Sequence, residues 1–322
     1  MRSLVSRHAL AAGILATMLL SAVCSGREEP TAPVLDAVVV TGERTGPGMW
    51  HVHHGAASVW ILASMSPLPR GITWRSKQFE ELLATTEQVL IPKPFDIGIV
   101  HILWLLITER SLLMVHGGKR LRDVMPPELY ARFSAERAKY TADSDKWERY
   151  RPIIAAAFLQ QDAFHQAGLS TRLDLGAAVR ALAEKHGVRV EELKIAGVRD
   201  FLDVLKTMPP ATENACVAAS LVTVEQDLPR LVERAQAWAS GNVERIAALR
   251  EPAEVDACRA ALDDGAEASE FINTVRHTWL EAIEKYLQGS AVTVAVVNMD
   301  MLLEKDGLLD ELRAKGYEVD AP

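Results

Sequence analysis

Cysteine is scarce in this sequence, which leaves room for very few covalent cross-links. The chain contains only three cysteines, Cys24, Cys216 and Cys258. Cys24 belongs to an N-terminal segment with export features, so Cys216 and Cys258 remain for the folded protein. Because an exported compartment is oxidising, we predict that these two residues form one disulfide. The alternative is a pair of unpaired, buried thiols.

A long uninterrupted apolar run is also missing after the N-terminal segment. The most apolar internal stretch, residues 95–115, is interrupted by Asp96, His101, Glu109 and Arg110. A membrane-spanning helix needs about 20 consecutive apolar residues, so we expect no transmembrane span in the mature chain. We interpret this stretch as a core helix. The alternative is a face that binds a membrane or an apolar partner.

A dense basic patch is absent as well. The sequence has 35 Lys and Arg residues against 43 Asp and Glu residues, a formal net charge of −8. Loss of an N-terminal signal would remove two arginines and no acid, so the mature chain would be more acidic still. Affinity for nucleic acids depends mainly on neutralising phosphates, so this balance disfavours a nucleic-acid partner.

The N-terminus has the layout of a secretory signal. Arg2 and Arg7 precede an apolar run over residues 9–20, and small residues follow. This order of charged, apolar and small residues is typical of a cleaved export signal. We therefore predict that residues 1–26 form a signal peptide, cut after Ala22 or slightly later, and that the protein is exported to a bacterial periplasm.

Cys24 raises an alternative to simple cleavage, because its thiol would be acylated in a lipoprotein. The bulky Val23 just before it makes a poor acylation signal, so we disfavour a lipid anchor at Cys24. An uncleaved anchor is the third possibility. Residues 27–45 carry Glu-Glu-Pro-Thr-Ala-Pro and then Thr-Gly-Glu-Arg-Thr, and they are expected to form a linker.

The folded part is predicted to be a helix-rich α/β domain over residues 46–322. With 49% hydrophobic residues, the chain can bury one large core or two modest ones. Short β-rich runs lie near both ends, and helical periodicity dominates between them, which predicts a small mixed sheet with a helical insertion over about 95–288. The expected strands are 49–54, 58–64, 89–91, 188–193, 291–297 and 317–319.

The expected helices follow from apolar spacing, caps and glycine stops. The last strand, helix and strand, residues 292–319, favour parallel pairing through a right-handed crossover. The expected helices are 73–87 with Thr73 as cap, one from Pro127, 143–166 with a bend at Pro152, 174–186, 198–207, 213–240 bent or divided near Pro229, 242–249, 254–262, 264–288 and 306–315.

Two segments near the ends of the mature chain carry a resemblance to a known family. Residues 46–76 include Gly-Met-Trp-His-Val and Val-Trp-Ile-Leu-Ala-Ser-Met-Ser-Pro-Leu-Pro, and residues 292–319 include Val-Thr-Val-Ala-Val-Val-Asn-Met-Asp. Two shorter segments agree in order and spacing, Trp238-Ala-Ser-Gly-Asn and Arg276-His-Thr-Trp. Together they resemble the TraB/GumN family, whose eukaryotic relatives include the Tiki proteases. The resemblance covers most of the mature chain.

The resemblance implies a metal-dependent peptidase ancestry with two Gly-x-x-His motifs, each after a strand. Two such imidazoles at strand ends would hold a metal that activates water. Here the first motif is Ala63-Ser-Met-Ser66 and the second is Val297-Asn-Met-Asp300. Serine and one carboxylate are too few ligands for a transition metal. We expect no cofactor, and a divalent metal only if the protein is an enzyme.

The candidate binding residues follow from these altered motifs. They are Ser64, Ser66, Arg276, His277, Asn298 and Asp300. Arg276 either orients a ligand carboxylate or carbonyl, or forms a structural ion pair with Asp300; both remain open. His277 would donate into the same crevice. No nucleophile elbow accompanies the serines, which disfavours a serine hydrolase.

A separate histidine cluster is the only other metal candidate. His51 and His53 share one face of the first predicted strand. No acidic or thiolate partner is evident nearby in the sequence, so solvated imidazoles on a half-exposed strand are the favoured interpretation.

Two functions remain. The first is an exported, non-catalytic binding or accessory protein for an unidentified peptide, polymer or protein. The second is a hydrolase with an altered site that uses Asp300, Arg276, Ser66 or the histidine cluster. Convergence of Asp300, Ser66 and Arg276 on an open cleft, with a further acid or imidazole, would favour the enzyme. Filling of that space by Trp60, Met299 and Met301 would disfavour it.

Overall fold

The computed structural model describes residues 46–72, 74, 77–93, 110–141, 147–171, 175–195, 197–249 and 252–322. All of them belong to one unit, Val34–Pro322. The predicted signal peptide and linker, the caps Thr73 and Asp174, and most of the apolar stretch at 95–115 lie outside the described residues. The described part is helix-rich α/β, as predicted.

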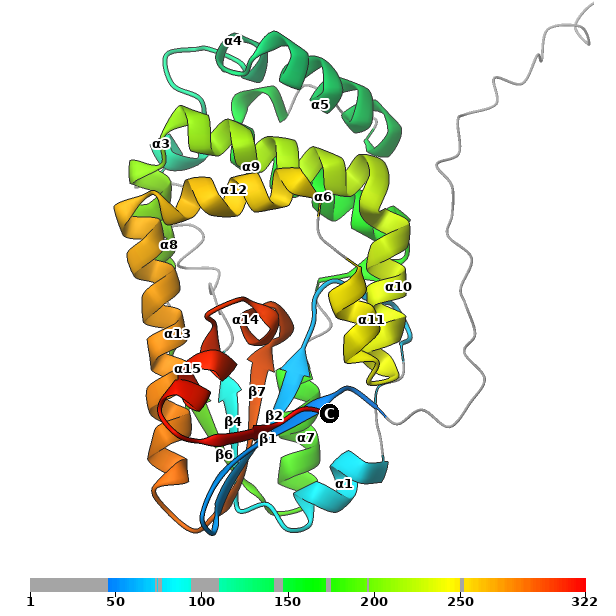
Figure 1. The fold of residues 1–322 in the computed structure, drawn as a ribbon. Coiled ribbons are helices and arrows are strands. Elements are labelled where there is room, and N and C mark those ends of the chain that lie inside the picture. The colour runs from blue at the N-terminus through cyan, green and yellow to red at the C-terminus, as the bar shows by residue number, and fades with distance from the viewer. Residues whose placement is uncertain are drawn as a thin grey trace, which may run out of the picture. The chain divides into compact units, whose positions relative to one another are not determined.

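A six-stranded mixed sheet has the order β6-β4-β7-β2-β1-β8 (Figure 1). An antiparallel hairpin joins β1 to β2 around Gly55, whose φ of 62° favours glycine. Strand β2 is parallel to β7, which pairs with β4, and β4 pairs with β6. The strands are β1 (Met49–His54), β2 (Ala57–Ser64), β4 (Gln88–Pro92), β6 (Arg189–Leu193), β7 (Val292–Asn298) and β8 (Glu318–Asp320).

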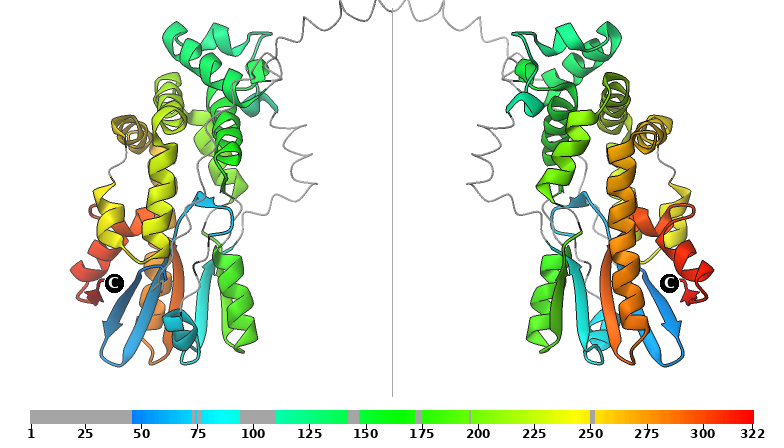
Figure 2. Two further views of the ribbon diagram at one scale, coloured as in Figure 1. Left: turned by 90° about the vertical axis from the view of Figure 1, so that its right-hand side faces the viewer. Right: turned by 90° about the vertical axis from the view of Figure 1, so that its left-hand side faces the viewer.

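The centre of the sheet forms the main core. Five consecutive residues of β7, residues 293–297, are buried, as expected for a central strand covered on both sides. Helix α13 (Ala266–Leu287) packs along β2 and β7, and α7 (Leu175–Lys185) packs against β4 and β6 (Figure 2). Because β2 and β7 come from opposite ends of the described chain, the sheet joins both ends, as predicted.

The helical middle has smaller cores of its own. One contains Phe133, Leu159 and Val217, and another contains Phe164 and Val224. The helices here are α3 (Arg110–Leu113), α4 (Leu121–Val124), α5 (Pro127–Tyr140), α6 (Pro152–Gln166), α8 (Val198–Thr207), α9 (Pro210–Val222), α10 (Leu228–Ala239), α11 (Val243–Ala248) and α12 (Ala253–Asp263). Three short helices come between strands of the sheet in chain order. They are α1 (Lys77–Leu83), α14 (Met299–Leu303) and α15 (Leu308–Ala314).

The predicted disulfide joins two neighbouring helices. Cys216 on α9 and Cys258 on α12 lie with their sulfur atoms at bonding distance and their Cα atoms 4.6 Å apart. Helices α9 and α12 run side by side (Figure 1). The required contact between two helical segments, predicted from the sequence, is therefore present.

Several predicted elements differ from the structure. The helix expected over 143–166 begins at Pro152, after a short 3-10 turn at Trp147–Arg149, because proline suits a first helical turn. The helix over 213–240 agrees with the prediction, because a π-helical turn, Thr223–Asp227, divides it just before Pro229. A two-stranded sheet, β3 (Leu68–Pro69) with β5 (Leu169–Ser170), was not predicted.

The predicted pairing of the last strand was wrong. Strand β8 pairs antiparallel with β1, at the edge of the sheet, and not with β7. Its direction is still parallel to that of β7, but β2 and β1 lie between them. The hairpin of β1 and β2 occupies the position beside β7 that a simple strand-helix-strand unit would fill.

Among the helices of the described residues, none combines the length and apolar character that a membrane crossing requires.

Candidate functional site

The two altered motifs lie side by side at the carboxyl ends of adjacent parallel strands. In the register of β2 and β7, Ala63 lies opposite Val297 and Ser64 lies opposite Asn298. The first positions of both motifs are therefore direct neighbours. Carboxyl ends of parallel strands are the usual ligand-binding edge of such sheets, so the fold places the motif segments where a site is expected.

The second motif forms a strand-to-helix turn. Asn298 ends β7 and caps α14, since its Oδ1 accepts a hydrogen bond from the Asp300 backbone N–H at 2.8 Å. Met299 is buried in the main core. Asp300 is exposed in the first turn of α14, where a negative charge is favourable. This helix was not predicted from the sequence, although Asn with an Asp two residues later is a typical helix start.

Trp238, the first residue of the Trp-Ala-Ser-Gly-Asn segment, holds the first motif in place. The Trp238 indole N–H donates to the carbonyl oxygen of Ala63 at 2.8 Å, and Trp238 is completely buried. After Trp238 the backbone turns at Gly241, which has a φ of 72°. Asn242 then caps α11 by accepting a hydrogen bond from the Arg245 backbone N–H. The Trp-x-x-Gly-Asn segment thus fixes the end of β2 and starts α11.

A pocket of about 460 Å³ opens at the end of β7. Its lining comes from β7 and α14 on one side, and from α10, α11, α12 and α13 on the others. Polar and apolar side chains are mixed. The lining residues are Arg234, Ile246, Ala247, Leu249, Arg259, Asp263, Ile272, Arg276, Asn298, Asp300, Met301, Leu303 and Glu304.

The arginines that line this pocket form ion pairs. Asp300 Oδ1 lies 3.1 Å from Arg234 Nη2. Arg276 does not pair with Asp300: its Nε lies 2.8 Å from Glu311 Oε1, and its Nη2 donates to Asn273 Oδ1 at 2.7 Å. The ion pair suggested between Arg276 and Asp300 is therefore replaced by two others, although both residues line the same pocket.

The other predicted site residues lie elsewhere. Ser64 is half-buried at the end of β2, and Ser66 is exposed before a cis bond to Pro67. His277 is exposed on α13 and lies 3.0 Å from Glu281, one turn along the same helix. None of these three is among the described residues that line the pocket.

The donor set of this pocket does not fit a zinc-type metal. Among its described lining residues there is no histidine or cysteine. The carboxylate at the second motif is paired with a guanidinium, which would repel a cation placed beside it. Met299 is buried in the core, while Met301 lines the pocket without closing it. The arrangement suits binding of a ligand with polar and apolar parts.

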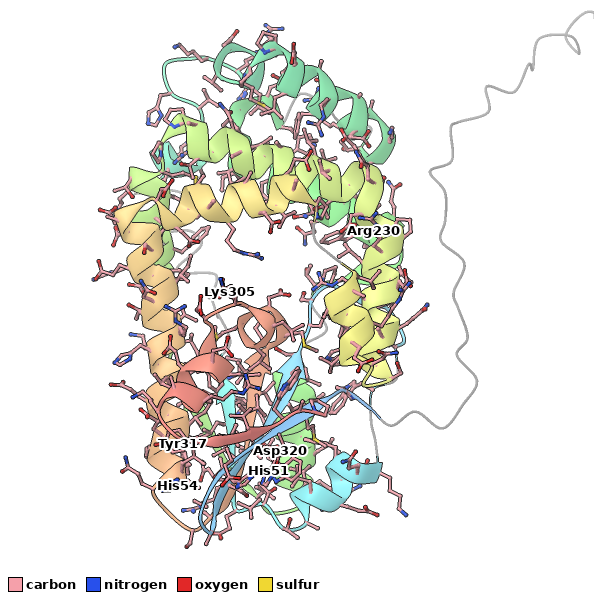
Figure 3. All side chains as sticks on the ribbon, in the orientation of Figure 1. His51, His54, Arg230, Lys305, Tyr317 and Asp320 are labelled. Carbon is pink, nitrogen blue, oxygen red and sulfur yellow. A yellow bond between two sulfur atoms is a disulfide. The ribbon has the colours of Figure 1, made fainter. Side chains whose placement is uncertain are left out.

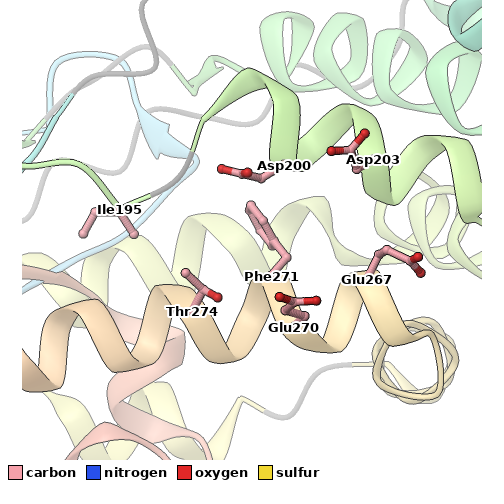
Figure 4. A pocket seen from close by; sticks show the side chains of 7 residues that line it. All are labelled: Ile195, Asp200, Asp203, Glu267, Glu270, Phe271 and Thr274. Carbon is pink, nitrogen blue, oxygen red and sulfur yellow. The ribbon is translucent and has the colours of Figure 1, made fainter.

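A second pocket, of about 240 Å³, lies between α8 and α13 and is largely acidic (Figure 4). Two of its acids already have local partners: Asp200 accepts from the Gly197 backbone N–H at 2.7 Å, and Asp203 from Lys206 at 2.9 Å. Because both contacts lie within α8 or at its start, they give Asp200 and Asp203 a role in stabilising that helix.

The histidine pair has an acidic partner, contrary to the sequence-based expectation. His51 lies opposite Asp320 in the pairing of β1 and β8. Asp320 Oδ2 lies 3.5 Å from His51 Nδ1 and 3.3 Å from His53 Nε2. Burial lowers the pKa of His51, as does nearby His53, while Asp320 acts in the opposite direction. The sequence could not reveal this partner, because nearly the whole domain separates β1 from β8.

The comparison with known families identifies a relationship along nearly the whole described chain. The profile of the TraB/PrgY/gumN family matches residues 48–321. No curated protein and no solved structure gives a significant match.

Proposed function

Because the chain belongs to the TraB/PrgY/gumN family, we propose that it is an exported, non-catalytic member that uses the pocket at the end of β7 to bind a peptide. The observation that carries this proposal is the composition of that pocket. A substantial pocket persists at the sheet edge, but its charged groups are guanidinium and carboxylate groups.

The mixture of side chains favours a peptide over a simple anion or an apolar molecule. Arg234, Arg259 and Arg276 present donors, and Asp263, Asp300 and Glu304 present acceptors. A peptide backbone offers both carbonyl oxygens and N–H groups to such a surface. Ile246, Ile272, Met301 and Leu303 add apolar contact for side chains. Convergence of polar groups beside apolar side chains in one concave pocket is typical of ligand sites.

Binding can be tested with labelled peptides of varied charge and apolar content. Fluorescence anisotropy would measure the affinity of the untagged protein for each peptide. We expect at least one class to bind, and Arg276→Gln to weaken it by about tenfold, the loss of one charge-assisted hydrogen bond. His277→Gln is the matched control, because His277 is the next residue on α13 and is exposed outside the pocket.

Catalysis can be tested in the same reactions. Mass spectrometry of the peptides after long incubation with Zn²⁺, Mn²⁺ or Co²⁺ should find them intact. Cleavage that requires the protein and is lost in Asp300→Ala would overturn the non-catalytic assignment. Equal binding by the wild type and Arg276→Gln, or no peptide binding at all, would overturn the assignment of the pocket.

A hydrolase is the second candidate, and one observation favours it. Asp300 and Arg276 do converge on an open pocket that contains two further acids, Asp263 and Glu304. Paired carboxylates can divide acid and base roles when their environments differ. Ser66 does not belong to this group, so the hydrolase would depend on the carboxylates, and the Asp300→Ala test applies to it directly.

Export is the other part of the proposal. It is supported by the signal-like N-terminus and by the Cys216–Cys258 pair, since disulfides persist in oxidising compartments. Fractionation of the producing bacterium and intact-mass measurement should find the mature protein in the periplasm, beginning between residues 23 and 27. A full-length cytosolic protein would contradict export, and a mass increase on Cys24 would indicate the lipid anchor instead.

A further inference from the structure

The geometry points to a binding site for a divalent transition-metal ion of the Zn²⁺ class, formed by His51, His53 and Asp320 on one face of β1 and β8. The two altered Gly-x-x-His motifs do not include these residues. The site is independent of the peptide pocket and does not depend on the proposed function.

Strand pairing brings these side chains to one face. Alternate residues of a strand point to the same side, so His51 and His53 share a face. Asp320 lies directly opposite His51, and Glu318 directly opposite His53. Directly paired residues of antiparallel strands point to the same side of a sheet. Two imidazoles and two carboxylates therefore gather on this surface, as Figure 3 shows for His51 and Asp320.

The two distances from Asp320 to the imidazole nitrogens match those that a tetrahedral metal imposes. With metal-to-ligand distances near 2.0–2.1 Å, adjacent ligand atoms of a tetrahedral zinc lie about 3.3 Å apart. Asp320 Oδ2 lies 3.5 Å from His51 Nδ1 and 3.3 Å from His53 Nε2. The three ligand atoms all lie within 4.8 Å of one another, so a ring rotation that brings the two imidazole nitrogens closer together would complete the set.

The rings are held in place without a metal. The His51 ring stacks on Trp60, with centroids 4.2 Å apart, and on His53, with centroids 4.8 Å apart. The histidine side chains are about a quarter exposed, whereas Asp320 is 66% exposed. An ion can therefore approach from the Asp320 side. Such restraint of ligand orientation lowers the ordering cost of binding.

The donor types select the metal. Imidazole nitrogens suit Zn²⁺ and similar ions, whereas Ca²⁺ and Mg²⁺ prefer sites made of oxygen atoms. Three protein ligands leave a fourth position for water or for Glu318, whose Oε2 already lies 3.9 Å from His53 Nε2. Two nitrogens and one or two carboxylate oxygens form a common zinc ligand set.

The location suggests what the ion does. Strand β8 is a three-residue edge strand, held to the sheet by β1 alone. An ion bound by His51, His53 and Asp320 would tie β8 to the hairpin. The site is well separated from the peptide pocket. In the sheet, His51 lies opposite Trp60, and Trp60 lies opposite Val294 of β7. Val294 precedes Asn298, at the pocket, by four residues, which is about 13 Å along the strand.

The test is calorimetric titration of Zn²⁺ into the untagged, chelator-treated protein. We expect one ion per chain, with affinity reduced at least about tenfold in His53→Gln, since even partners that only orient ligands contribute that much. His54→Gln is the matched control. His54 is the adjacent residue, points to the other face and packs edge-on against Tyr317 at 5.8 Å.

Further measurements distinguish Zn²⁺ binding at this site from a folding defect and from Zn²⁺ binding elsewhere. Circular dichroism must show the same apo fold for His53→Gln and the wild type, and Asp320→Asn should weaken Zn²⁺ binding without removing either imidazole. Asp300→Ala should leave binding unchanged, whereas a loss there would place the metal in the peptide pocket. The absence of stoichiometric Zn²⁺ binding, or full binding by both His53→Gln and Asp320→Asn, would overturn the proposal.

Discussion

At the scale of single residues, the positions where the resemblance implies glycine have become part of the packing. Ala63 and Val297 are completely buried opposite each other, and Met299 is 1% exposed. Where the resemblance implies glycine, Val297 fills the space with a branched side chain. Asp300 has a guanidinium partner in Arg234. Each position therefore has a structural role that needs no metal.

The first prediction concerns restoration of the two histidines. The double variant Ser66→His, Asp300→His should show no metal-dependent peptidase activity, because Ser66 is exposed and is not among the described residues lining the pocket. The Asp300 change would also leave Arg234 without its carboxylate. Peptide cleavage followed by mass spectrometry, with added Zn²⁺, Mn²⁺ or Co²⁺, checks this. Metal-dependent turnover by the double variant would show that the family site survives intact.

The second prediction concerns the pH dependence contributed by Tyr286. Burial, together with a hydrogen bond from its hydroxyl to Glu191, raises the pKa of Tyr286 to about 12. In the unfolded chain a tyrosine loses its proton near pH 10. Between these values the unfolded state binds fewer protons, so the stabilising contribution of Tyr286 is complete below pH 10 and is lost as pH rises toward 12.

The measurement compares the wild type with Tyr286→Phe by urea denaturation at several pH values. The wild type should be the more stable of the two below pH 10, and its advantage should shrink as pH rises above that value. Lys285 and Arg189 also lie near Tyr286, but both are unchanged in the variant. An advantage that stays constant from pH 9 to 12 would contradict the prediction.

At the scale of elements, buried ion pairs connect the helices of the middle region. Arg151, just before α6, donates through Nε and Nη2 to both carboxylate oxygens of Glu213 on α9, each at 3.1 Å. Glu213 also accepts from the Ile153 backbone N–H at 3.2 Å. Arg151 additionally donates to the Leu205 carbonyl oxygen. One charged group thus ties together α6, α8 and α9.

The third prediction is the loss of this pair. Glu213→Leu should lower the free energy of unfolding by about 3 kcal/mol, because it leaves a buried guanidinium without its carboxylate. Urea denaturation followed by circular dichroism measures the change. Adding Arg151→Met should recover part of the loss, since no unpaired charge then remains. A cost below about 1 kcal/mol for Glu213→Leu alone would show that the pair contributes little.

At the scale of the whole molecule, one cross-link joins parts of the chain that are distant in sequence. Cys216 and Cys258 are separated by 42 residues and connect α9 to α12. Helix α12 has no fully buried residue, so its apolar contacts alone hold it weakly. The disulfide is therefore expected to be a main support of this helix.

The fourth prediction follows from the loop that this disulfide closes. By the chain-entropy estimate, a loop of this length contributes about 4 kcal/mol. Cys216→Ser with Cys258→Ser should lower the free energy of unfolding by roughly that amount, and reduction of the wild type should have the same effect. Denaturation with and without reductant measures both. Intact mass before and after reduction is the control, and an unchanged midpoint on reduction would contradict the prediction.

The sequence by itself determined the secondary structure of the sheet and much of the helical middle. Alternation and β-branched residues located β1, β2, β4 and β7, because those patterns depend on neighbours in the chain. It also predicted the disulfide, since only two cysteines remained. It predicted that both altered motifs follow strands, and the register of β2 and β7 places them side by side.

Only the tertiary structure decided the partners of charged and coordinating side chains. Arg276 pairs with Glu311, Asp300 with Arg234, and His51 with Asp320, and in each case the partners lie on different elements. The same holds for β8, which pairs with β1 although β7 is nearer in sequence. Local patterns determine which face a side chain occupies, whereas the packing of distant elements determines what it meets there. For this reason the sequence located the motif segments but not the pocket or the acid beside the histidines.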